Sequence, residues 1–125
     1  VMIRENGFLG WLLNQLKLEK QVNLFSNTFF SPTPVNLLNQ AIAYIITTPS
    51  FNRKILNFAG PRVSRHEFGV DLVKKMGLKA SLIAPEIANY NSSTFQSDLS
   101  LITSSKLKDI LENYSQELIK ESTYV

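Results

Sequence analysis

Cysteine is absent from the 125 residues of this chain. Its absence excludes disulfide bonds, catalytic thiols and zinc sites that use cysteine ligands, and it is consistent with the cytoplasmic location that we expect. Histidine occurs once, as His66, between Arg65 and Glu67 at the expected start of a helix. Because no further ligands or nucleophiles cluster around this histidine, the sequence predicts neither a metal site nor a catalytic triad.

Long apolar runs are also missing, and so is a strong excess of charge of one sign. The longest candidate run, residues 41–46, is far shorter than the roughly 20 residues that a membrane span needs. The 13 basic and 10 acidic residues give a net charge of +3, and the basic residues are scattered. We therefore expect neither a membrane nor a nucleic acid as a partner. The length and the 44% of hydrophobic residues fit one small globular domain.

Glycine is sparse, and the sequence has no complete glycine-rich phosphate loop. In a dinucleotide-binding fold, such a loop follows the first strand and lets backbone N–H groups at a helix start meet the pyrophosphate. The nearest match, at residues 7–10, lacks the first glycine and a complete strand–turn–helix setting. We interpret it as the start of a helix.

The hydrophobic periodicity predicts alternating strands and helices. In the first half we expect the end of a buried strand at residues 1–4, a turn at 5–7, a helix at 8–18, a half-buried strand at 21–25 and a loop at 26–33. A further helix follows, with Thr33 as its N-cap and Pro34 in its first turn, and Pro49 ends it. Because the chain opens inside a strand-like run, we expect it to be part of a longer protein.

In the second half we expect a strand at residues 55–59 and a turn at Gly60 and Pro61. Ser64 and Glu67 predict a capping box at the start of the next helix, and Gly77 ends that helix. We further expect an extended segment at 81–85, an aperiodic polar stretch at 86–101, a short helix at 103–111, and a helical extension or tail at 113–125. This order predicts α/β or α+β packing around a small sheet that is incomplete without a partner domain.

The succession of strand, Gly-Pro turn, Ser cap, amphipathic helix and Gly stop over residues 54–78 resembles the C-terminal part of extended short-chain dehydrogenases/reductases. The similarity is to members that act on nucleotide sugars, in particular the dTDP-4-dehydrorhamnose reductase group of the NAD-dependent epimerase/dehydratase superfamily. Residues 27–38 resemble the family's polar loop and the helix after it, and residues 97–107 resemble its C-terminal segment. The resemblance spans roughly residues 1–112, and residues 113–125 form a separate extension.

This resemblance implies a C-terminal α/β substrate domain that packs on a Rossmann-type, doubly wound parallel sheet outside this chain. It implies NAD(P) as the cofactor, bound mainly by that Rossmann half, with Arg4 and Asn6 of this chain at the cofactor. The residues that it places at a nucleotide-sugar substrate are Phe8, Asn27, Phe29, Ser31, Pro32, Thr33 and Arg62. The guanidinium groups of Arg62 and Arg65 suit the oxygens of a diphosphate, and a solvated surface position is the alternative role for each.

Catalysis in this family needs a Tyr with a Lys four residues later, because the Lys lowers the pKa of the Tyr that gives a proton to the carbonyl. None of the four tyrosines, Tyr44, Tyr90, Tyr114 and Tyr124, is followed by a Lys at that distance. We therefore expect no catalytic residue in this chain and no activity of the chain alone.

We expect the chain to be the substrate-side portion of an NAD(P)-dependent oxidoreductase that reduces a keto-sugar on a nucleoside diphosphate, as in dTDP-rhamnose biosynthesis. Two alternatives stay open: a non-catalytic, dinucleotide-binding regulatory subunit on the same fold, and a stand-alone α/β interaction module. A Tyr-x-x-x-Lys motif upstream of this chain favours the enzyme over the regulator. An exposed apolar face, on which the missing half packs, favours the enzyme and the regulatory subunit over the stand-alone module. A homodimer is a further arrangement that stays open.

Overall fold

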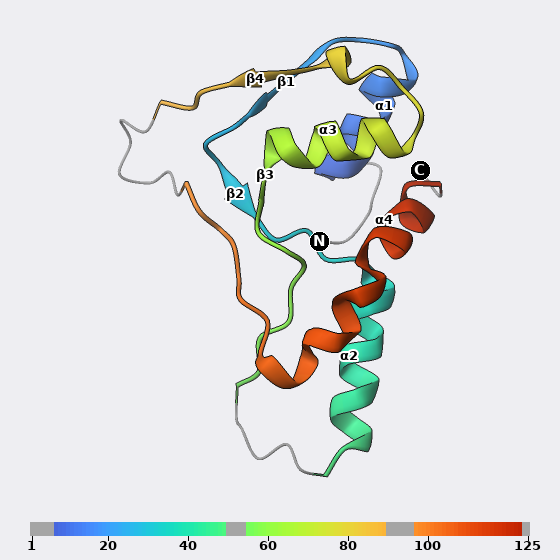
Figure 1. Cartoon of the computed structure of the whole chain (residues 1–125), viewed down its shortest axis with the longest axis vertical. Coiled ribbons are helices and arrows are strands. Elements are labelled where there is room, and N and C mark those ends of the chain that lie inside the picture. Colours follow the sequence, from blue (N-terminus) through green and yellow to red (C-terminus); the bar gives the residue numbers. More distant parts are fainter. Residues whose placement is uncertain (1–6, 50–54, 90–96, 124–125) are drawn as a thin grey trace.

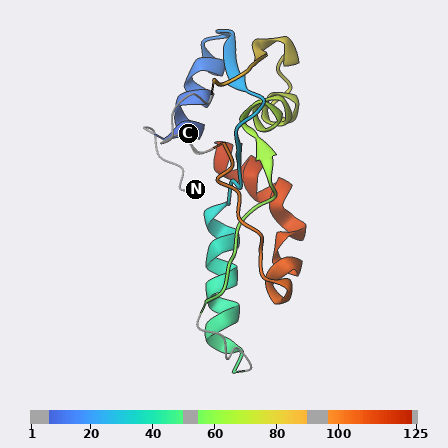
Figure 2. The same ribbon diagram turned by 90° about the vertical axis from the view of Figure 1, so that its left-hand side faces the viewer.

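The computed structural model describes residues 7–49, 55–89 and 97–123. The molecule is elongated: the strands, α1 and α3 lie at one end, and α2 extends to the other beside the C-terminal helices (Figures 1 and 2). In chain order the elements are α1 (Phe8–Lys17), β1 (Val22–Phe25), β2 (Phe29–Phe30), α2 (Val35–Thr47), β3 (Val63–Ser64), α3 (Arg65–Lys75), the 3-10 helix η1 (Ala80–Leu82), β4 (Ile83–Glu86), the 3-10 helix η2 (Ser105–Asn113) and α4 (Tyr114–Thr123).

Two small sheets organise the strand-bearing end. Strands β1 and β4 pair in parallel, with Val22 opposite Ile83, and α3 packs against both of them. Strands β2 and β3 pair antiparallel, with Phe29 opposite Ser64. Helices around a small parallel sheet confirm the predicted α/β class.

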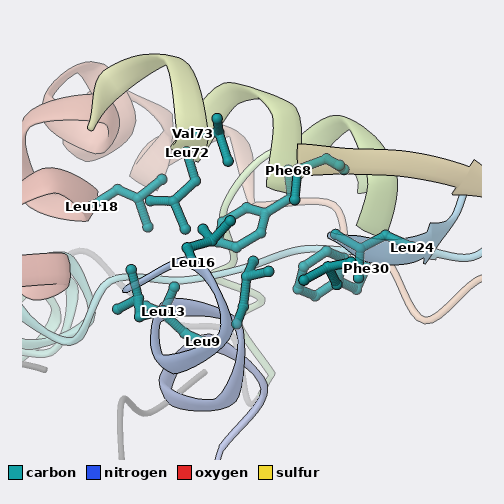
Figure 3. Packing of buried hydrophobic residues seen from close by; sticks show 12 residues of the cluster. Leu9, Leu13, Leu16, Leu24, Phe30, Phe68, Leu72, Val73 and Leu118 are labelled. Carbon is teal, nitrogen blue, oxygen red and sulfur yellow. The ribbon is translucent and has the colours of Figure 1, made fainter. Parts of the chain in front are cut away.

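The hydrophobic core lies where α1 and α3 pack against the strands (Figure 3). Leu9, Leu13 and Leu16 share one face of α1, because residues three and four apart are neighbours on a helix. Leu118 of α4 joins the same core, so α4 is part of the packed structure and not a loose tail. The buried members are Leu9, Leu12, Leu13, Leu16, Val22, Leu24, Phe30, Phe68, Leu72, Val73, Ile83 and Leu118.

An aromatic cluster joins α1, β2 and α3 within this core. The ring of Phe30 meets the rings of Phe8 and Phe68 edge-on, with centroids 5.8 and 5.5 Å apart. The Arg65 guanidinium lies 4.6 Å from the Phe8 ring centroid and 4.9 Å from that of Phe30. Burial lowers the pKa of Arg65, but an arginine stays charged, so its cation can interact with both ring faces.

Several predicted elements are confirmed. The helix expected at 8–18 is α1, and the strand expected at 21–25 contains β1. The capping box of α3 is complete: the Glu67 N–H donates to Ser64 Oγ at 3.0 Å, and the Ser64 N–H donates to Glu67 Oε2 at 3.2 Å. Gly77 follows the C-cap residue Met76 with a φ of +73°, the left-handed conformation that glycine adopts easily at a helix end.

Other predictions are wrong in identifiable ways. The loop expected at 26–33 contains β2, a strand too short to show an alternating pattern. The strand expected at 55–59 is not part of a sheet, because the Ala59 N–H donates to the side chain of Thr103 and not to a neighbouring strand. Pro34, not Thr33, is the N-cap of α2, since the Thr33 hydroxyl bonds to Ser31 and Gly60.

The C-terminal half also differs in detail. The extended segment expected at 81–85 divides into η1 and β4, and the helix expected at 103–111 is a 3-10 helix that begins at Ser105. The polar stretch 86–101 begins inside β4. The strand end expected at 1–4, the turn residues Glu5 and Asn6, and part of the polar stretch lie outside the described residues.

Replacing Ser64 with Ala removes the side-chain acceptor at the start of α3. We expect Ser64→Ala to lower the free energy of unfolding by about 1 kcal/mol, the usual cost of losing such a cap. Urea denaturation measures this change. Ser81→Ala, at an exposed serine of η1, is the matched control and changes stability by less than about 0.5 kcal/mol. Equal losses in the two variants would contradict the capping role.

Candidate functional site

An open groove of about 610 Å³ lies between the segment that precedes β3 and the segment that leads into η2. Its volume is within the range of about 300–1,000 Å³ that is common for small-molecule sites. Its walls are Ala59, Gly60, Pro61, Arg62, Asp98, Ser100, Leu101, Ile102, Thr103, Lys108 and Leu111.

The segment from Ser97 to Leu101 forms one wall and pairs with β2 and the residue after it. The Phe29 N–H donates to the Ser97 carbonyl at 2.8 Å, and the Leu99 N–H donates to the Phe29 carbonyl at 2.9 Å. Two residues further on, the partner changes: the Leu101 N–H donates to the Ser31 hydroxyl at 3.0 Å. The wall is therefore a strand-like segment. Its backbone pairs with Phe29, and the Ser31 side chain continues this pairing at Leu101.

Two further hydroxyl groups fix the opposite wall. The buried Thr103 hydroxyl accepts the Ala59 N–H at 3.0 Å and donates to the Ala59 carbonyl at 2.6 Å. Next to it, the Ser104 N–H donates to the Asn57 carbonyl at 2.8 Å, and Ser104 Oγ accepts the Asn57 N–H at 3.1 Å. Side-chain hydroxyls thus take the place of strand backbone and satisfy groups that would otherwise be unpaired.

The Ser31-Pro32-Thr33 segment contacts Gly60, which lines the groove. The Thr33 hydroxyl donates to the Ser31 carbonyl at 3.0 Å and accepts the Gly60 N–H at 3.0 Å. A Cβ atom at position 60 would lie 1.8 Å from the Pro32 carbonyl oxygen, so only glycine allows this approach. This contact fixes the loop after β2 against Gly60 in the groove wall.

The charged end of the groove is built on Phe29. Arg62 Nε lies 3.0 Å from Asp98 Oδ2, and the guanidinium carbon lies 3.7 Å from the centroid of the Phe29 ring. Hydrogen bonds from the side chain and the backbone N–H of Ser100, followed by Arg62, lower the pKa of Asp98 to about 2. Asp98 is therefore ionised at neutral pH. Lys108 is a second cation on the groove wall.

The structure places the predicted substrate residues at different distances from the groove. Arg62 lines the groove. Four others contact residues that line it: Phe29 contacts Arg62, Ser31 bonds to Leu101, and Pro32 and Thr33 both contact Gly60.

The other predicted residues lie further away. Phe8 belongs to the aromatic cluster of the core. Asn27 extends the β1–β4 pairing, because its Nδ2 donates to the Ala88 carbonyl at 3.0 Å and its Oδ1 accepts the Ala88 N–H at 2.9 Å. Substrate contact by these seven residues stays a prediction, and Arg4 and Asn6 lie outside the described residues.

Sequence reasoning missed the groove residues from Asp98 to Thr103 and those of η2. Asp98 and Ser100 form a short turn in which the Ser100 N–H donates to Asp98 Oδ1 at 2.9 Å, and an Asp followed by Ser two residues later is a recognisable signal for such a turn. Leu101, Ile102 and Lys108 carry no comparable local signal. The segment that carries them is held by long-range hydroxyl contacts: the Leu101 N–H donates to the Ser31 hydroxyl, and the neighbouring Thr103 bonds to Ala59.

Over the part of the chain that the structure describes, no group of three or more His, Cys, Asp or Glu side chains is placed to hold a metal ion. Nor does any described helix combine the length and the apolar character needed to cross a membrane. His66 lies half-buried in the first turn of α3.

Replacing Gly60 with Ala tests the close approach to Pro32. We expect Gly60→Ala to lower the free energy of unfolding by about 3 kcal/mol, because the new methyl group forces the two backbone segments apart. Gly77→Ala is the matched control: it has open space around it and costs about 1 kcal/mol through its positive φ alone. A smaller loss for position 60 than for position 77 in urea denaturation would refute the constraint.

The pKa of Asp98 provides a second test. Because its folded-state pKa is lowered, Asp98 stabilises the fold at neutral pH, and this contribution is lost as the pH falls towards about 2. In Ser100→Ala we expect the carboxyl pKa to rise towards its ordinary value of 3.8, and in Arg62→Gln to rise less. NMR titration of the side-chain carboxyl measures both; a larger rise in Arg62→Gln would reverse the assigned order of causes.

Comparison with models of protein families gives no match, and comparison with curated protein sequences gives none either. Among solved structures, the chain is similar to dTDP-4-dehydrorhamnose reductase from Bacillus anthracis str. Ames in complex with NADP, with a TM-score of 0.71 and 15% sequence identity. The match covers 94% of this chain and 44% of that chain, so this chain spans less than half the length of the reductase. At this identity the likeness shows the fold, and it confirms the predicted resemblance: the chain has the fold of an α/β portion of that reductase.

Proposed function

We propose that this chain is the substrate-side portion of an NAD(P)-dependent nucleotide-sugar reductase of the dTDP-4-dehydrorhamnose reductase type. The observation that carries this proposal is the fold match, which extends over nearly the whole chain and belongs to an NADP-bound reductase. A dinucleotide-binding unit outside this chain supplies NAD(P), the Tyr and the Lys. When bound, the cofactor supplies the hydride for reduction of the keto-sugar.

The groove has the features that such a role requires. Arg62 and Lys108 place two cations on walls that otherwise include the apolar residues Pro61, Leu101 and Ile102. A nucleotide sugar combines a dianionic diphosphate with a flat, partly apolar base, so this mixture is complementary to it. The Phe29 ring and the Asp98 carboxylate hold the Arg62 guanidinium in place before any ligand arrives. Such positioning reduces the entropy that is lost when the substrate is fixed for reaction.

The direct test uses the native gene product that contains this chain. We expect it to bind NADPH and to oxidise NADPH when a dTDP-linked 4-keto-sugar is added, with both followed by NADPH fluorescence. Binding of NADPH without oxidation, in the presence of several keto-sugar nucleotides, would favour the regulatory subunit. No binding of NADPH would contradict the proposal.

Arg62→Gln tests the groove as the diphosphate site. In the native gene product we expect this variant to weaken binding of dTDP about tenfold, which corresponds to about 1.4 kcal/mol for one charge-assisted contact. Lys74→Gln removes the same charge from an exposed position of α3 and is the control. Isothermal titration calorimetry measures both affinities, and an equal effect of the two substitutions would show only a general loss of positive charge.

A further inference from the structure

Helix α2 lies at the surface but carries no charged residue. Its sequence, Val35–Thr47, contains no Asp, Glu, Lys or Arg. A helix that faces water on one side normally has charged residues on that side and apolar residues on the other. The composition of α2 is therefore that of a helix with apolar contacts on more than one side.

The rest of the chain covers one edge of this helix. Leu37 and Ala41 are buried, and α2 contacts η2 and α4 (Figure 2). Asn36 Nδ2 donates to Glu117 Oε2 of α4 at 3.0 Å, which fixes the two helices against each other. This hydrogen bond also contributes most to the lowering of the Glu117 pKa.

A second edge of α2 is apolar and exposed. Leu38, Ile42 and Ile46 have exposed fractions of 37%, 47% and 77%. Successive members are four residues apart, so they form one line along the helix with a rotation of only about 40° at each step. We call these three side chains the α2 stripe. The described part of the chain leaves it open to solvent, although its side chains have the character of a buried helix face.

We propose that the α2 stripe is the surface on which the dinucleotide-binding unit of the complete protein docks. This inference rests on the proposed function, and the length of the compared reductase supports it, because 44% of that chain accounts for nearly all of this one. The absence of charge on α2 indicates an apolar partner surface, such as the outer face of a helix or sheet in an α/β domain.

The size of the stripe favours a domain of the same protein over a second copy of this chain. A stable dimer of free chains buries about 800 Å² on each partner, which is more than three side chains provide. Domains joined in one polypeptide need less contact area, because the covalent link keeps the partner at a high effective concentration.

Photo-crosslinking in the native gene product tests this inference. A benzoylphenylalanine crosslinker replaces Ile42, and the control places it at Ile87, which is 72% exposed and lies just after β4. We expect position 42 to crosslink to a peptide of the dinucleotide-binding unit, identified by mass spectrometry, and position 87 not to do so. No crosslink from position 42, or a crosslink to a second copy detected by mixing isotope-labelled and unlabelled protein, would overturn the inference.

Stability and cofactor binding give an independent readout on the same protein. We expect Ile42→Lys to lower the melting temperature of the native gene product by several degrees, because it buries an unpaired charge, and Ile87→Lys to leave it unchanged. If the native gene product binds NADPH but gives no crosslink from position 42, the proposed docking surface is wrong and the proposed function is not affected. A product that crosslinks and binds NADPH but reduces no sugar nucleotide would leave the docking surface intact and contradict the proposed reductase function.

Discussion

The close approach of Gly60 to the Pro32 carbonyl connects the two ends of the molecule, because it joins the loop after β2 to the segment that leads into β3. On one side of this contact, Thr33 leads directly into α2. On the other side, Arg62 lines the groove and Ser64 caps the start of α3. A side chain at position 60 would separate these segments and displace the part of the groove wall that Gly60 forms.

Hydroxyl groups extend this contact into a continuous framework. Ser31, Thr33, Thr103 and Ser104 each bond to backbone groups of a segment distant in sequence. A hydroxyl can donate and accept at once, so each of these side chains can replace an interrupted strand edge without leaving a buried polar group unpaired. The groove therefore has walls of irregular backbone that are nevertheless held by defined hydrogen bonds, which is the usual setting for a binding site on a rigid scaffold.

The sequence was sufficient to predict the elements whose signals are local. The leucine spacing of α1, the Ser64–Glu67 capping box and Gly77 each act within one helix, and all three were predicted. The β2–β3 pairing was missed because it involves two residues on each side, too few for a periodic pattern. Thr33 was assigned to the wrong partner because its hydroxyl bonds to Gly60, a contact that depends on the folded arrangement. Leu101 and Lys108 line the groove without any local sequence signal, so they were missed for the same reason. Arg62, which the family resemblance suggested, also lines the groove, and its contact with a substrate stays a prediction.

The chain presents two kinds of surface: a groove lined by Arg62 and Lys108, and an uncharged helix with an open apolar stripe. Both surfaces enter the proposal that this chain is the substrate-side unit of a reductase and packs on a second unit that carries the cofactor. A structure of the native gene product with NADPH and dTDP bound tests this account most directly. The account predicts dTDP in contact with Arg62 and the groove walls, and NADPH held mainly by residues outside this chain. A structure in which dTDP contacts no residue of this chain would contradict it.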